Sequence, residues 1–217
     1  MSRDARPVFG PLRTRLEHVE AVRDGLAHDR FLPVHGASGN VLAVYEWSDY
    51  GVTLFARYPE SAIDQDVFLV DPEDREVRQL FNTSAFEADG SVSPDGQWLA
   101  YASTFTGRWE VYITSLVPSG NTKVVTNGGG VDPRWSRSGR ELYYVHSVTG
   151  ELMAVDVSTD AGVIGIGEPR RIYAGPLKWG SVHSFAPVPP DETRFLVWTH
   201  DPDPGDITVL LGWDRRP

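Results

Sequence analysis

The sequence predicts an all-β protein built from repeated sheets of four antiparallel strands. The first observation is a turn followed by a strand pattern, since Pro94-Asp95-Gly96 precedes the apolar run WLAYAS. Proline presets φ, aspartate bonds nearby backbone and glycine tolerates positive φ, so this triplet favours a tight turn. The second observation is that the unit recurs along the chain. The third is composition, because 21 glycines and 16 prolines in 217 residues suit many short strands joined by turns.

The repeat has a regular spacing. Its turn motif begins at Trp47, Val92, Trp135 and Val188, so consecutive copies are separated by 45, 43 and 53 residues. A period in the forties with about four strands per repeat is the spacing of β-propeller blades. We therefore predict a propeller over residues 36–217, with blades at about 41–82, 87–127, 131–174 and 182–213.

Each copy continues into a third strand. An acidic residue precedes every one of these strands, namely Asp66, Glu110, Glu151 and Asp206. The first three copies then add a fourth apolar run, whereas the last copy stops before a fourth strand can form. These fourth runs lie at residues 76–81, 123–126 and 170–174.

Residues 1–35 form an extension outside the repeat. Apolar residues at Leu16, Val19, Val22 and Leu26 have helical spacing, which predicts a short amphipathic helix. Phe31 to Val34 is predicted to add the outer strand that the last blade lacks, which would close the ring and remove an exposed edge. Four repeats are few, so the alternatives are a compact ring, an open arc that dimerises, or a fragment of a longer protein.

The motifs carry a family resemblance. SPDGQWLAYAS, GRWEVYI, GGGVDPRWSRSGRELYYV and GELMAVDV resemble the TolB-like propeller repeats of bacterial proteins, over roughly residues 41–213. They are similar to the propeller regions that follow the kinase domain of many bacterial serine/threonine kinases. The resemblance implies a WD-like β-propeller fold, but a fold alone does not imply an activity.

Charge and composition narrow the classes of partner. The chain carries 30 acidic and 20 basic side chains, a formal charge of −10, which disfavours nucleic acid and anionic membrane. It has no cysteine, which excludes disulfides and thiolate chemistry. The charged N-terminal sequence and the lack of a long apolar run predict a cytoplasmic protein without direct membrane insertion. The family resemblance implies the periplasm as the alternative.

No catalytic, cofactor or metal motif appears. The sequence lacks the G-x-S-x-G nucleophile elbow, the P-loop, the kinase motifs and H-E-x-x-H. Gly128 to Gly130 precedes Val-Asp-Pro and a strand, so a loop between blades is predicted rather than a phosphate site. The carboxylates of Asp201 to Asp206 suit calcium, but two prolines and a glycine predict a hairpin turn there. The six histidines have no ligand spacing.

We therefore predict a non-catalytic module that binds a protein or peptide, in bacterial signalling or envelope-related transport, with a homodimer as one assembly. Trp179 lies in a loop outside the repeat, where a tryptophan can anchor a partner. The other tryptophans recur at strand positions and are predicted to pack between blades. The alternative is a hydrolase or lyase in the propeller channel, using Asp132, Asp191, His183 or Arg134. The predicted contact residues are Trp179, Trp109, Arg108, Arg134 and His183.

Overall fold

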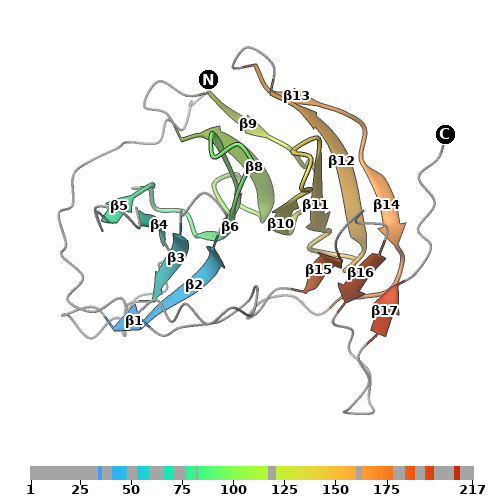
Figure 1. The fold of residues 1–217 in the computed structure, drawn as a ribbon, viewed down its shortest axis with the longest axis horizontal. Helices are drawn as coiled ribbons and strands as arrows, with labels where there is room; N and C mark the ends of the chain where they lie inside the picture. Colours follow the sequence, from blue (N-terminus) through green and yellow to red (C-terminus); the bar gives the residue numbers. More distant parts are fainter. Residues whose placement is uncertain are drawn as a thin grey trace.

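The computed structural model consists of four antiparallel sheets that follow one another around an arc (Figure 1). No α-helix occurs in the part of the chain that the structure describes, and the helix predicted within residues 12–26 lies outside that part. The described residues are 34–35, 41–47, 53–58, 66–70, 77–81, 83–116, 121–159, 163–177, 184–188, 194–197 and 208–210.

In the first two sheets, the strands are hydrogen-bonded to one another in chain order. The first is β1 (Val34–His35), β2 (Val41–Trp47), β3 (Thr53–Tyr58), β4 (Asp66–Val70) and β5 (Val77–Gln79). The second is β6 (Glu87–Val92), β7 (Trp98–Ser103), β8 (Glu110–Ser115) and β9 (Thr122–Val124).

The last two sheets repeat this order. The third is β10 (Val131–Trp135), β11 (Glu141–Val145), β12 (Leu152–Ser158), β13 (Gly165–Ile166) and β14 (Arg170–Tyr173), with β13 and β14 both pairing with β12. The fourth is β15 (Phe185–Val188), β16 (Arg194–Val197) and β17 (Thr208–Leu210). The predicted all-β architecture of antiparallel propeller sheets is thereby confirmed.

One residue of the predicted closing strand pairs elsewhere in the structure. Val34, at the end of the segment expected to close the last blade, belongs to β1, which pairs with β2 in the first sheet. Only residues 36–40 separate the two strands, and they include two glycines. A connection this short favours a hairpin with the next strand over a long-range pairing with the last sheet. Phe31 lies outside the described residues.

A hydrophobic core fills the space between each pair of consecutive sheets. The central core, between the second and third sheets, contains Trp98 and Trp135, which confirms their predicted packing role. A second core joins the first two sheets, where Tyr101 and Tyr112 stack with ring centroids 5.5 Å apart. The third joins the last two sheets, where Tyr143 meets Phe195 edge-on at 5.0 Å. Packing between sheets therefore holds the arc together.

The inner strands β6 and β10 share a distortion that the sequence did not predict. Asp89 and Asp132 occupy equivalent positions and have positive φ values of 56° and 52°, and the strand register shifts at both sites. The Asp89 carboxylate accepts the backbone N–H of Asp132, and the Asp132 carboxylate accepts that of Ser184. Each bulge thus links one inner strand to the next around the arc.

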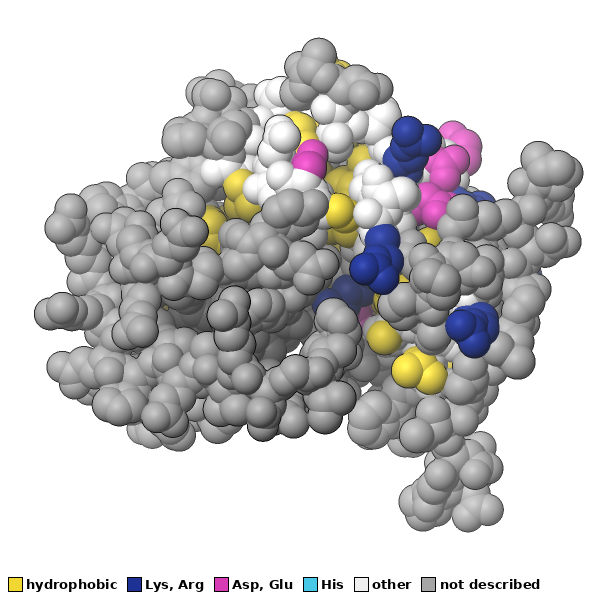
Figure 2. Space-filling view, viewed as in Figure 1, with side chains coloured by type: hydrophobic (Ala, Val, Ile, Leu, Met, Phe, Trp, Pro, Cys, Tyr) yellow, Lys and Arg dark blue, Asp and Glu magenta, His cyan; other side chains and the backbone are white. Residues whose placement is uncertain are grey.

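A few charged side chains are visible over the last two sheets (Figure 2). Figure 2 shows basic side chains over the third and fourth sheets, with acidic side chains beside the uppermost of them. Arg170 of β14 pairs with Glu141 of β11 and with Asp156 of β12, so one guanidinium spans three strands of the third sheet. No helix among the described residues is long and apolar enough to cross a membrane.

Candidate protein-binding surface

Two turns and one connection meet at the end of the central sheets where the inner strands begin. We call this region, residues 104–109, 125–130 and 146–151, the Gly128 end. A β-carbon on Gly129 would lie 2.3 Å from the Ser147 hydroxyl oxygen, so the connection after β9 passes directly against the turn between β11 and β12. The opposite end carries the turns at residues 93–97 and 136–140, and we call it the Gly96 end.

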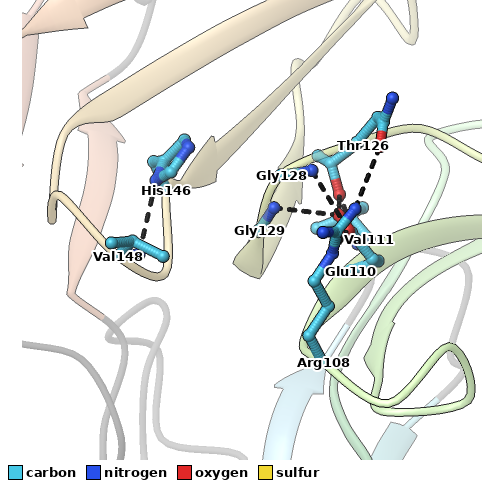
Figure 3. A network of polar contacts seen from close by, with 9 residues as sticks. Arg108, Glu110, Val111, Thr126, Gly128, Gly129, His146 and Val148 are labelled. Carbon is cyan, nitrogen blue, oxygen red and sulfur yellow. Dashed lines mark hydrogen bonds and ion pairs between the residues drawn. The ribbon is translucent and has the colours of Figure 1, made fainter.

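A buried carboxylate fixes the Gly128 end. Glu110, at the start of β8, is only 2% exposed, and four donors converge on it (Figure 3). The Thr126 hydroxyl donates to one oxygen at 2.5 Å, and the backbone N–H groups of Gly128 and Gly129 donate at 3.1 Å each. Arg108 Nε donates to the other side of the carboxylate at 2.5 Å. The glycine loop is therefore held by protein rather than open to a phosphate, which agrees with its prediction as a structural loop.

These contacts set the protonation state of Glu110. Burial alone raises the pKa of the Glu110 carboxyl, but hydrogen bonds from Thr126 and Arg108 and from the two glycine amides outweigh burial. The net effect lowers the pKa below its ordinary value of 4.5, so the group is a carboxylate at neutral pH. A charged acceptor makes stronger hydrogen bonds than a neutral one, which stabilises the loop.

The equivalent residue in the third sheet, Glu151, has a different environment. Its carboxylate accepts hydrogen bonds from Thr149 at 2.9 Å and from Arg171 of β14 at 2.8 Å. The Arg171 side chain is largely exposed, so this pair is screened by water. The hydrogen bond from Arg171, followed by that from Thr149, lowers the pKa of Glu151. In both sheets the repeated acidic position thus links the third strand to the segment after it, with very different burial.

Exposed side chains lie on the turns at the Gly128 end. Phe105, in the turn between β7 and β8, is 43% exposed, and Val148, in the turn between β11 and β12, is 80% exposed. The Arg108 side chain, three residues after Phe105, is 57% exposed and also donates to Asn127. Sequence reasoning missed Phe105 and Val148. Their signal was an apolar residue placed inside a polar turn, where burial is not expected.

The structure locates three of the five predicted contact residues. Arg108 and Trp109 both lie at the Gly128 end, but Trp109 is partly buried, packs against the third core and lies 6.5 Å from Phe86. Arg134 is mostly buried, and its Nε lies 3.8 Å from Asp132. Trp179 and His183 lie outside the described residues, so their role stays a prediction.

Only some of the residues named for the alternative function, a hydrolase or lyase in the propeller channel, lie in the part of the chain that the structure describes. Asp132 is buried, and its carboxylate already contacts Arg134 and the Ser184 backbone. Asp191 and His183, together with the predicted turn at 201–206, lie outside the described residues. Within the described part of the chain, no three histidine or carboxylate side chains gather where they could hold a metal ion.

A cavity of about 890 Å³ lies at the Gly96 end, away from Arg108 and Trp109. It lies between the turns at 93–97 and 136–140, and the end of β12 lines it. Asp95 accepts hydrogen bonds from the Ser93 hydroxyl and the Gln97 backbone, which confirms its predicted turn-stabilising role. The two other lining carboxylates, Glu141 and Asp156, are both paired with Arg170. The acidic groups of this cavity therefore stabilise the turn and the sheet.

Substitution of Gly150 tests the close backbone contact between the turn after β11 and the segment after β14. Its φ is +71°, and an added β-carbon would lie 2.9 Å from the Pro176 α-carbon and 3.0 Å from the Leu177 nitrogen. We expect Gly150→Ala to lower the free energy of unfolding by more than the 1–2 kcal/mol, roughly, that left-handed backbone alone costs. Gly107→Ala is the control, because its φ is +87° but no atom lies within 4 Å of the added carbon. Equal losses in urea denaturation would contradict this backbone contact.

Sequence comparison finds two relatives, while no family model matches the chain. A TolB homologue of Chlorobium chlorochromatii is 30% identical over 87 residues, which cover 40% of this chain and 20% of the relative. A TolB homologue of Chlorobaculum tepidum is 27% identical over 112 residues, covering 52% of this chain and 25% of the relative. The chain thus matches a quarter or less of the length of these relatives.

Structure comparison points to the same fold. TolB from Acinetobacter baumannii superimposes with a TM-score of 0.54 and 18% identity, covering 76% of this chain and 39% of that protein. The four antiparallel sheets, the recurring turn motif and these similarities agree with one another. The predicted resemblance to TolB-like repeats is thereby confirmed: the chain has a β-propeller fold and is similar in sequence to TolB homologues over part of its length.

Proposed function

We propose that this chain is a non-catalytic β-propeller module that binds a protein or peptide at its Gly128 end, in bacterial signalling or envelope-related transport. The observation that carries the proposal is the pair of exposed apolar side chains, Phe105 and Val148, on the equivalent turns of two consecutive sheets. An apolar side chain that is removed from water when a partner binds contributes to affinity in proportion to the apolar area buried.

The hydrogen bonds that order the backbone at the Gly128 end support the same proposal. Glu110 bonds the glycine loop, and the ring nitrogen Nδ1 of His146 accepts the backbone N–H group of Val148 at 3.3 Å (Figure 3). The same nitrogen accepts the backbone N–H group of Thr149 at 3.3 Å. A turn whose backbone is already ordered loses little conformational entropy when a partner binds. The backbone at the Gly128 end, which carries Phe105 and Val148, is therefore suited to binding a partner without rearranging.

Val148→Asp tests this proposal. Peptides are first selected against the immobilised wild-type protein from a random library displayed on phage, and their affinities are then measured by fluorescence anisotropy. We expect Val148→Asp to weaken the selected peptides by about tenfold or more, because a charge at a buried apolar contact costs at least about 1.4 kcal/mol.

Val163→Asp is the matched control. Val163 is also an exposed valine, at 66%, but it follows the end of β12 at the Gly96 end. It should leave peptide affinity within about twofold of the wild type. Equal losses in both variants, or loss only in Val163→Asp, would place the binding surface elsewhere.

A further inference from the structure

The fourth sheet has an open outer edge among the described strands. Its third strand, β17 (Thr208–Leu210), pairs with β16 and with no other described strand. In each of the other sheets, the strand equivalent to β17 has an antiparallel neighbour on its outer side, namely β5, β9 or β14. An edge strand presents unpaired N–H and C=O groups that can pair with an added strand.

Val34, the described residue of the segment predicted to cover this edge, pairs in the first sheet instead. Val34 and His35 pair with Val41 and Leu42 of β2, so their backbone hydrogen bonds belong to the first sheet. Among the described strands, none therefore fills the outer position of the last sheet. Addition of a peptide strand to a sheet edge is a common mode of recognition, in which main-chain hydrogen bonds supply the affinity.

The outer strands of the first three sheets indicate which sequences suit this position. Their sequences are VRQ in β5, TKV in β9 and RRIY in β14, so each has at least one basic and one β-branched residue and none is acidic. Basic side chains of β9 and β14 make hydrogen bonds: Lys123 donates to the Ile164 carbonyl, and Arg171 donates to the Glu151 carboxylate. A basic strand also suits a chain with a formal charge of −10.

We propose that the β17 edge binds an extended segment of a partner protein, rich in basic and β-branched residues, as the fourth strand of the last sheet. This surface is separate from the one at the Gly128 end. The proposal therefore does not depend on Phe105 or Val148, and Val148→Asp should leave binding at β17 unchanged.

The test uses a fluorescent peptide with the sequence of residues 168–174, EPRRIYA, as a substitute fourth strand. Two N-methylated forms carry methyl groups on alternate backbone nitrogens, at the positions of Arg170 and Ile172 or of Arg171 and Tyr173. Alternate N–H groups of a strand point to opposite edges, so only one form blocks pairing with β17. We expect that form to lose about tenfold or more in affinity, and the other to stay within about twofold of the parent peptide.

Hydrogen exchange of the whole protein locates the bound peptide. Slower exchange at residues 208–210 on adding the parent peptide, with the one-sided effect of N-methylation, would support the proposal. No binding, or equal effects of the two methylated forms, would overturn it. Full protection of residues 208–210 before any peptide is added would also overturn it, because a segment of this chain or a second copy would then already cover the edge.

Discussion

Phe195→Ala is expected to lower the free energy of unfolding by about 3–5 kcal/mol, the usual loss when a buried phenylalanine is truncated. Phe195 of β16 is fully buried, meets Tyr143 of the third sheet edge-on and lies 6.2 Å from Phe185. Its removal leaves a cavity in the core that joins the last two sheets. Urea denaturation followed by tryptophan fluorescence and circular dichroism measures the loss.

The adjacent residue provides the control. Leu196 points to the other side of the sheet and is 42% exposed, so Leu196→Ala should cost less than about 1 kcal/mol. The alternating burial of β16 predicts this contrast. Similar losses for the two variants would mean that the last sheet does not pack against the third as described.

Glu110→Ala is expected to cost about 3 kcal/mol in the free energy of unfolding. The substitution leaves the N–H groups of Gly128 and Gly129 and the Thr126 hydroxyl without their acceptor, and unsatisfied buried donors cost about 1–3 kcal/mol each before relaxation. Glu151→Ala is the matched control at the equivalent position. Its carboxylate is only partly buried, at 22% side-chain exposure, and pairs with a largely exposed arginine, so a much smaller loss is expected. A larger loss for Glu151→Ala would contradict the assigned role of Glu110.

The contribution of Glu110 also depends on pH. Because folding lowers the pKa of this carboxyl, its ionised form stabilises the folded protein fully above the ordinary pKa of 4.5. That contribution is lost as pH falls through the lower, folded-state pKa. The gap in unfolding free energy between wild type and Glu110→Gln should therefore narrow on acidification. A gap that widens toward low pH would contradict the lowered pKa.

Much of the local structure could be predicted because it depends on short-range patterns. The turn at Pro94-Asp95-Gly96, the alternation in the strands and the recurring motif all act within a few residues of one another, and Trp98 and Trp135 lie in the predicted core. Gly128 to Gly130 was also correctly predicted to form a loop, although the role of Glu110 as its acceptor was not. That role needs residues 16–19 positions apart to meet, which no local pattern specifies.

Other features depend on long-range packing. The bulges at Asp89 and Asp132 arise where each aspartate bonds a backbone N–H group 43 or 52 residues away in sequence, so the equivalent aspartates looked like ordinary strand residues. Among the predicted contact residues, Arg134 and Trp109 are largely engaged in an ion pair and in core packing. Residue type alone could not show that these two side chains are engaged within the protein, because arginine and tryptophan occur both on binding surfaces and in interiors.

Hydrogen exchange with a bound peptide tests the proposed binding surface most directly. A peptide selected from the random library is added to the full chain, and backbone exchange is compared with and without it. We predict slower exchange at residues 104–109 and 146–150, the two turns that carry Phe105 and Val148. Unchanged exchange in both turns, with protection at residues 93–97 and 136–140 instead, would contradict a binding surface at the Gly128 end.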